Sequence, residues 1–233
     1  MPYSTKIKND LSPVQKHALV IESYLTDYCR MDSQLSAASF IASFSEAFLE
    51  EVCPEVRGLP AALIISESAD EAYLEIHLSK EIYTKLMSEP NLPDLLNHRE
   101  GLNSFLILAE EISHFHHYLR NAEIGAPVRR FDLELQAEID KLVIGSLILN
   151  KIFGQSQTNQ LTHILFNEVS FHGSMTDYAL ASKITEKFWK YHLTLLGKNM
   201  IFNSRFRRII QIMTRTSGDE KIRLLNSEMK NAA

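Results

Sequence analysis

Three side chains that often bind metals, Glu110, His114 and His117, are spaced at helical intervals in the middle of the chain. At about 100° per residue they fall within an arc of roughly 60° on one face of a helix. Apolar residues occupy much of the remaining surface of this segment, so we expect the helix to lie inside the protein. A carboxylate and imidazoles in such a position must be hydrogen-bonded, ion-paired or bound to a metal, because an isolated buried charge costs several kcal/mol.

A second set of polar side chains follows on the next predicted helix, where Glu134 and Glu138 are four residues apart and Lys141 continues the same face. A short loop joins the two helices, so we expect them to pack antiparallel. Glu134 would then face Glu110 and His114, with His117 in reserve. Two carboxylates and an imidazole suit a divalent transition metal. The alternative for the second set is a network of ion pairs on the helix surface.

The elements that carry these residues predict a mainly α-helical chain with a small β-hairpin or sheet, an α+β fold. All seven prolines fall at or before Pro127, so the second half of the chain can be almost entirely helical. An apolar run at 61–66 and alternating residues at 72–78 predict the hairpin. Periodicity and capping residues predict helices at 13–30, 33–52, 80–87, 102–121, 131–152, 158–171, 176–196, 204–213 and 218–230.

Length and composition indicate an ordinary globular protein that folds as a single domain, residues 1–233. Of its 233 residues, 45% are hydrophobic and 23% are charged, and the net charge is −5. This charge gives no general attraction to nucleic acid or to an anionic membrane. The first ten residues lack the apolar run of a signal peptide, and no stretch is long enough to span a bilayer, so we expect a cytoplasmic protein. Cys29 and Cys53 are expected to be buried, reduced thiols.

The segment from Ile107 to Phe115, ILAEEISHF, resembles the active-site helix of zincin metallopeptidases. In that family an Ala-His-Glu-x-x-His run supplies two zinc ligands and a catalytic glutamate. The segment at 134–138, ELQAE, resembles the Glu-x-Glu-Ala-Asp/Asn element that supplies the third ligand. The short separation of the two motifs and the preceding hairpin are most like the small ImmA/IrrE-type metallopeptidases. The resemblance implies a zincin-like core at about 61–150, followed by a C-terminal helical extension at about 155–233.

The resemblance also implies a role for each matched residue. Glu111 would be the general base, which accepts a proton from metal-bound water, and His114 and Glu134 would be metal ligands. Glu110 replaces the first histidine of the motif as a substituted ligand, and Glu138 replaces the bracing Asp or Asn and is included among the candidate metal ligands. Zinc is the first expectation, and the carboxylate-rich set also suits iron or manganese. The implied activity is metal-dependent hydrolysis of a peptide or protein substrate.

The substitution at Glu110 leaves other functions open. If Glu110 cannot complete the site, the fold remains, without a metal and without the chemistry. Glu111 and His114 also match the Glu-x-x-His spacing of carboxylate-bridged di-iron helical proteins. A second copy of that motif is missing, because Glu168 and His172 are four residues apart rather than three.

A non-enzymatic regulatory or interaction protein is a further alternative. A basic and aromatic cluster near the C-terminus could contact phosphate or an acidic partner, and it contains Phe202, Arg205, Phe206, Arg207 and Arg208. Such clusters are commonly solvated helix faces, so nucleic acid is not the favoured partner. The sequence does not indicate an oligomeric state.

Overall fold

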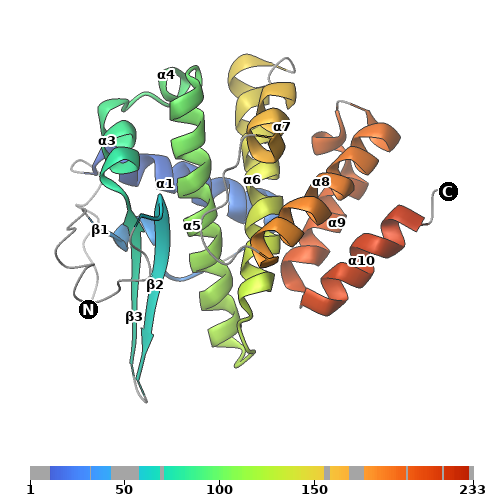
Figure 1. The fold of residues 1–233 in the computed structure, drawn as a ribbon, viewed down its shortest axis with the longest axis horizontal. Coiled ribbons are helices and arrows are strands. Elements are labelled where there is room, and N and C mark those ends of the chain that lie inside the picture. Colours follow the sequence, from blue (N-terminus) through green and yellow to red (C-terminus); the bar gives the residue numbers. More distant parts are fainter. Residues whose placement is uncertain are drawn as a thin grey trace.

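The computed structural model describes residues 11–31, 33–42, 58–68, 71–154, 158–167, 176–197, 199–216 and 218–230. Within these ranges the protein is mainly α-helical with a small three-stranded sheet, which confirms the predicted fold class. Figure 1 shows the sheet on one side, two long antiparallel helices in the middle, and the C-terminal helices on the other side. None of the described helices is both long enough and apolar enough to cross a membrane.

The N-terminal part of the chain forms helices that pack around the sheet. Ser12 caps the first helix by accepting a hydrogen bond from the Gln15 backbone, and the Gln15 side chain accepts one from the Ser12 backbone in return. The elements in this part are α1 (Pro13–Tyr24), a π-helical turn (Leu25–Cys29), a 3₁₀ turn (Ala37–Ser39), β1 (Ile41–Ala42), β2 (Ala61–Glu67), β3 (Ala72–Leu78), α3 (Lys80–Ser88) and α4 (Leu92–Leu96).

The sheet has the order β1-β3-β2 and contains the predicted hairpin. β2 and β3 are antiparallel with Ala61 opposite Leu78, and β1 runs parallel to β3 with Ile41 opposite Ile76. The predicted helix at 33–52 is therefore wrong at 33–36 and 40–42, with only a 3₁₀ turn at Ala37–Ser39, and residues 43–52 lie outside the described ranges. Ile76 donates a backbone hydrogen bond to the Phe40 carbonyl at 2.8 Å, so pairing with β3 overrides the helical pattern here.

The central helices are α5 (Arg99–Glu123) and α6 (Arg130–Phe153). α5 lies between α6 and the N-terminal part, and α6 continues the contact to α7 and α8. The sequence placed the start of α5 after Gly101, but this glycine is inside the helix. A Cβ atom at Gly101 would lie 2.0 Å from the Leu95 carbonyl oxygen, so glycine allows α4 and α5 to approach closely.

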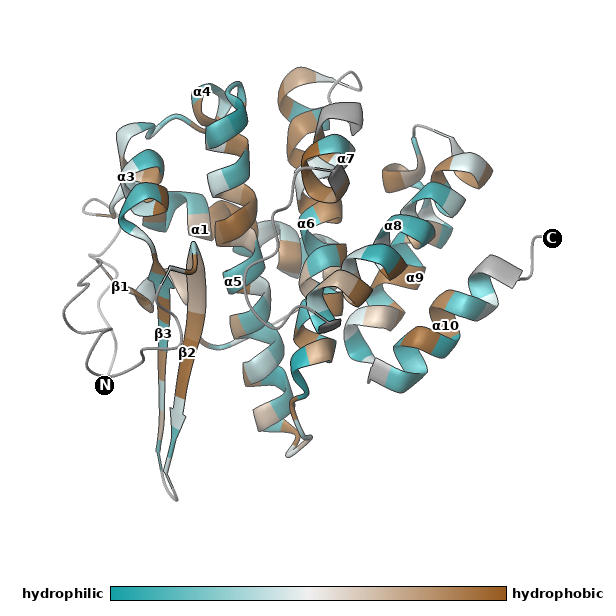
Figure 2. Ribbon diagram, in the orientation of Figure 1, coloured by the Kyte–Doolittle hydropathy of each residue, from teal (hydrophilic) through white to brown (hydrophobic). Residues whose placement is uncertain are grey.

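The C-terminal helices agree with the predicted ones where the structure describes them. They are α7 (Thr158–Asn167), α8 (Thr176–Leu196), α9 (Ser204–Arg215) and α10 (Gly218–Lys230), whereas residues 168–171 of one predicted helix lie outside the described ranges. One cluster of buried apolar side chains extends from Val14 to Leu225. Figure 2 shows hydrophobic and hydrophilic residues alternating around these helices, and mostly hydrophilic residues near the turn of the β2–β3 hairpin. Cys29 is buried and free, as predicted, and Cys53 is not among the described residues.

Candidate metal centre

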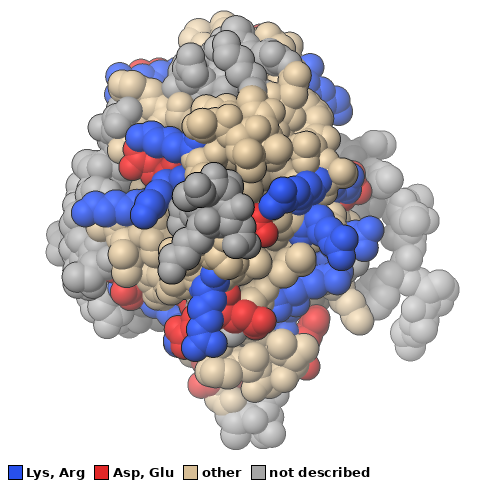
Figure 3. Space-filling model, turned by 90° about the vertical axis from the view of Figure 1, so that its right-hand side faces the viewer, with Lys and Arg blue, Asp and Glu red and all other residues tan. Residues whose placement is uncertain are grey.

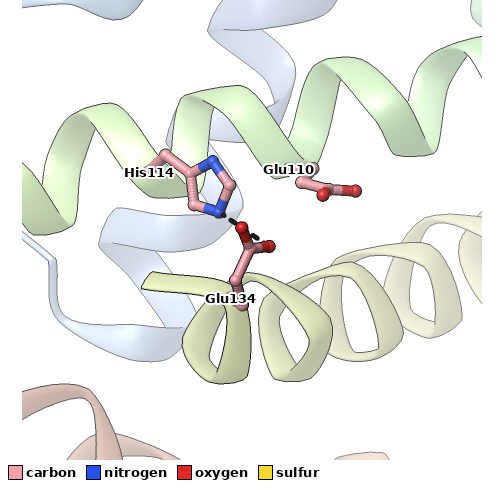
Figure 4. Close-up of side chains that lie close together, drawn as sticks. All are labelled: Glu110, His114 and Glu134. Carbon is pink, nitrogen blue, oxygen red and sulfur yellow. Dashed lines mark ion pairs between the residues drawn. The ribbon is translucent and has the colours of Figure 1, made fainter. Parts of the chain in front are cut away.

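Three of the predicted ligands come together between the central helices. Glu110 and His114 lie one turn apart on α5, and Glu134 lies on α6 opposite them (Figure 4). One ligand atom from each residue can be chosen so that all three lie within 4.8 Å of one another. The antiparallel packing predicted from the short loop therefore brings the two motifs face to face. Glu110, His114 and Glu134 are called the triad below.

His114 directs its two ring nitrogens at two different carboxylates. Nε2 lies 3.7 Å from Glu134 Oε2, and Nδ1 lies 3.5 Å from Glu111 Oε2. Nε2 is buried and has no hydrogen-bond partner among the described residues. A nitrogen and an oxygen bonded to one ion at roughly 2.1 Å are about 3.4 Å apart in a tetrahedral site. The 3.7 Å distance between His114 Nε2 and Glu134 Oε2 is therefore close to the separation that a shared metal ion requires.

Glu111 lies on the side of the His114 ring that faces away from Glu134. A carboxylate at the distal nitrogen commonly fixes the orientation and tautomer of a metal-binding histidine. In the present arrangement Glu111 Oε2 lies within ion-pair distance of Nδ1, without hydrogen-bond geometry. Its role as general base stays a prediction, and it would require the carboxylate to reach a water molecule on the Nε2 side of the ring.

The surroundings of the triad favour the charged forms of Glu110 and His114 and disfavour the charged form of Glu134. Burial disfavours the charged form of Glu110, but the charge of Lys141 and, to a lesser extent, that of His114 keep its pKa below the ordinary value. Burial also opposes protonation of His114, yet the carboxylate of Glu111, together with those of Glu134 and Glu110, raises its pKa to about 9. The pKa of Glu134 is raised by burial and by Glu110 and Glu111, against the charge of His114. The metal-free triad therefore holds an imidazolium between carboxylates.

Lys141 lies beside the triad and is buried, which disagrees with the alternative of an ion-pair network on the helix surface. Its Nζ donates to Glu110 Oε2 at 2.6 Å and to the Tyr178 hydroxyl on α8 at 3.2 Å, and it forms an ion pair with Glu138. Despite burial, Glu110 and Glu138 raise the pKa of Lys141 well above its ordinary value. The structure thus places Glu138 against Lys141 and outside the triad, so a ligand role for Glu138 stays a prediction.

The triad reaches solvent at one edge while its neighbours on α6 do not. The Glu110 side chain is 18% exposed and those of His114 and Glu134 are 11% exposed, compared with 3% for Lys141 and 1% for Glu138. Water could therefore approach the carboxylates of the triad, although His114 Nε2 itself is buried among the described residues. Such an open edge is typical of catalytic rather than structural metal sites.

A second polar cluster, which the sequence did not reveal, surrounds Asp140 on α6 and includes side chains of α5. Asp140 accepts hydrogen bonds from the Ser113 hydroxyl at 2.7 Å and from the Gln136 amide at 2.8 Å. Gln136 in turn accepts a hydrogen bond at 2.6 Å from Lys221, which links α10 to α6. His117, the reserve ligand, lies 3.7 Å from Asp140 and does not join the triad.

The basic and aromatic cluster near the C-terminus is divided by the fold. Phe206 is buried in the core, whereas Phe202 is 59% exposed. Arg205 pairs with Glu228 at 3.2 Å, and Arg207 stacks on the ring of Tyr28. Figure 3 shows Lys and Arg side chains in several separate groups on this side of the molecule, with acidic side chains beside some of them. The cluster therefore does not form one continuous surface for phosphate.

Comparison with known protein families, with characterised proteins and with solved structures finds no match for this chain. The resemblance to zincin metallopeptidases depends on the motifs at 107–115 and 134–138, and it stays a prediction. A functional conclusion must therefore come from the geometry of the triad.

Proposed function

We propose that this protein binds one divalent transition-metal ion through Glu110, His114 and Glu134 and acts as a metal-dependent hydrolase. The observation that carries the proposal is the convergence of the three ligand groups within 4.8 Å around a buried imidazole nitrogen. That nitrogen has no hydrogen-bond partner among the described residues. A buried polar atom without a hydrogen bond is costly, so an ion that replaces the Nε2 proton and accepts the freed lone pair would stabilise the arrangement.

Three protein ligands and an open edge favour catalysis over a purely structural site. A bound divalent ion would supply Lewis acidity and lower the pKa of a coordinated water molecule. Glu110 and Glu134 would contribute negative charge that balances the ion, and His114 would contribute a neutral nitrogen. Glu111 would keep the His114 ring oriented through Nδ1.

The ligand set limits the choice of metal and suggests a substrate class. Two carboxylates and one imidazole suit zinc, iron(II) and manganese(II). The proposed substrate is a peptide or protein, in keeping with the resemblance of residues 107–115 to the zincin helix. The rival function, a metal-free regulatory protein with the same fold, predicts that the triad is an ion-pair network only.

Metal analysis of purified protein tests the proposal directly. We expect close to one equivalent of zinc, iron or manganese in the wild type after reconstitution with each metal, and little in His114→Ala or Glu134→Ala. Matched controls are His98→Ala and Glu123→Ala, which remove exposed side chains of the same types on α5 and at its N-cap. Absence of metal in the wild type, or equal metal in the ligand variants and the controls, would contradict the proposal.

Glu111→Gln distinguishes the two roles of Glu111 within the proposed hydrolase. If Glu111 is only the general base, this variant should keep its metal affinity and lose peptide hydrolysis. If Glu111 orients His114, as its position at Nδ1 indicates, metal affinity should fall by roughly 10- to 100-fold. Metal titration followed by a peptide-cleavage assay on the fully loaded variant separates these outcomes.

A further inference from the structure

We propose that the ammonium group of Lys141 occupies the position of a second cation beside the triad and so keeps the proposed centre mononuclear. The inference rests on the proposed metal site and goes beyond it, because it states how many ions the centre can hold. It also identifies Lys141 as a positioning residue for Glu110.

The surroundings of Lys141 Nζ have the character of a cation site. Three oxygen atoms contact it, from Glu110 at 2.6 Å, from Tyr178 at 3.2 Å, and from Glu138 in an ion pair. These residues come from α5, α8 and α6, so three helices enclose the ammonium group. An ammonium has three N–H donors, and three acceptors satisfy all of them. The site is therefore filled by a cation that belongs to the chain itself.

Glu110 links this cation to the triad. Lys141 binds Glu110 Oε2, and one oxygen of the same carboxylate lies within 4.8 Å of ligand atoms of His114 and Glu134. In two-metal sites the ions lie about 3.5–4 Å apart, and one carboxylate can contact both. Glu110 thus has the position of a carboxylate that bridges two cations, and one of these cations is the Lys141 ammonium.

The formal charges favour one divalent ion in addition to Lys141. Glu110, Glu134 and Glu138 carry three negative charges, which the ammonium and one divalent ion neutralise. Glu138 depends on this arrangement because it is 1% exposed and Lys141 is the cation that pairs with it. Removal of Lys141 would leave a buried carboxylate that needs another cation.

The arrangement restricts the chemistry of the centre. A single ion can activate one water molecule, whereas two-metal hydrolysis and di-iron chemistry need a second ion next to the first. The second position is adjacent to the triad, but the lysine side chain fills it. The di-iron alternative would therefore require Lys141 to leave its three oxygen partners.

Two substitutions separate the charge of Lys141 from its volume. Lys141→Ser removes the ammonium and opens the space that it fills, whereas Lys141→Met removes the charge and keeps most of the volume. Manganese(II) alone is the probe, followed by elemental analysis and by electron paramagnetic resonance. We expect one manganese with an isolated-ion spectrum in the wild type, two manganese ions with a spin-coupled spectrum in Lys141→Ser, and no more than one in Lys141→Met.

The outcomes also separate this inference from the proposed function. A wild type that binds no manganese would overturn both. If the wild type and a folded Lys141→Ser each bind one ion, only the inference is overturned. Two ions in the wild type would also overturn only the inference. If Lys141→Ser does not fold, Glu138→Gln provides the test. We expect its manganese affinity to stay within about threefold of wild type. A manganese affinity reduced by more than tenfold would show that Glu138 is a ligand of the first ion.

Discussion

Acid should destabilise this protein through His117, which lies on α5 beside the buried Asp140 cluster. His117 is 5% exposed, and its Nε2 is 3.7 Å from Asp140. Burial lowers the pKa of His117 from 6.5 to about 4, and the charges of Lys221 and Arg120 act in the same direction against the partial support of Asp140. The folded protein therefore holds a neutral imidazole at this position.

The size of this acid destabilisation follows from the lowering of the His117 pKa on folding. Because the folded-state pKa lies below the unfolded-state value, protonation of His117 favours the unfolded chain. The penalty is absent well above pH 6.5 and grows as the pH falls from 6.5 to about 4. At 1.36 kcal/mol per pKa unit, the full penalty is roughly 3 kcal/mol, and about 2 kcal/mol of it is present near pH 5.

Urea unfolding of metal-free wild type and His117→Gln, each at about pH 7.5 and about pH 5, measures this contribution. Other histidines titrate in both proteins, so their effects cancel in the comparison. We expect the free energy of unfolding of the wild type to fall by about 2 kcal/mol more than that of the variant over this range. Equal losses in the two proteins would show that His117 is not held neutral by its surroundings.

Metal binding to the triad is expected to release close to one proton per ion near pH 7, because the pKa of His114 is about 9 without metal and the ligand is the neutral imidazole. Calorimetry in buffers of different ionisation enthalpy measures this number, and a value near zero would contradict the protonated state. Gly101→Ala should lower the free energy of unfolding by about 1–3 kcal/mol or more, since its Cβ would lie 2.0 Å from the Leu95 carbonyl oxygen. Gly145→Ala, whose Cβ would meet a movable Leu161 methyl at 2.9 Å, should cost less in the same denaturation experiment, and an equal cost would contradict the distinction.

The helices that carry the triad were predictable because local signals agree there. Helical periodicity, a short loop and the Glu-x-x-x-His spacing from Glu110 to His114 all act over a few residues, and the antiparallel packing follows from the loop length. Glu134 could be placed opposite them for the same reason. The β2–β3 hairpin was predicted from alternation, which is also a local pattern.

Features that depend on distant partners were not predictable from the sequence. Residues 40–42 have a helical pattern, but Ile41 and Ala42 pair with β3, at positions more than thirty residues further along the chain. Asp140 was not recognised because its partners include Ser113 on α5 and Cys29 near the N-terminus, and no spacing rule connects them. The burial of Lys141 was left open, because its spacing from Glu138 suits an exposed ion pair equally well. Only the packing of α8 across α6, which brings Tyr178 over the ammonium, shows that Lys141 is buried.

Lys141 also gives a physical reason for the glutamate at position 110, where the resemblance would lead one to expect histidine. The ammonium is 3% exposed and binds Glu110 Oε2 at 2.6 Å, so Glu110 serves both as a partner of Lys141 and as a member of the triad. A histidine at 110 would remove the negative charge from this contact and leave a buried ammonium with Glu138 as its one anionic partner among the residues that contact it here. The loss of a charged partner in such a place is strongly destabilising. Glu110 and Lys141 are therefore best understood as a pair, and a return to the His-Glu-x-x-His pattern would require a change at both positions.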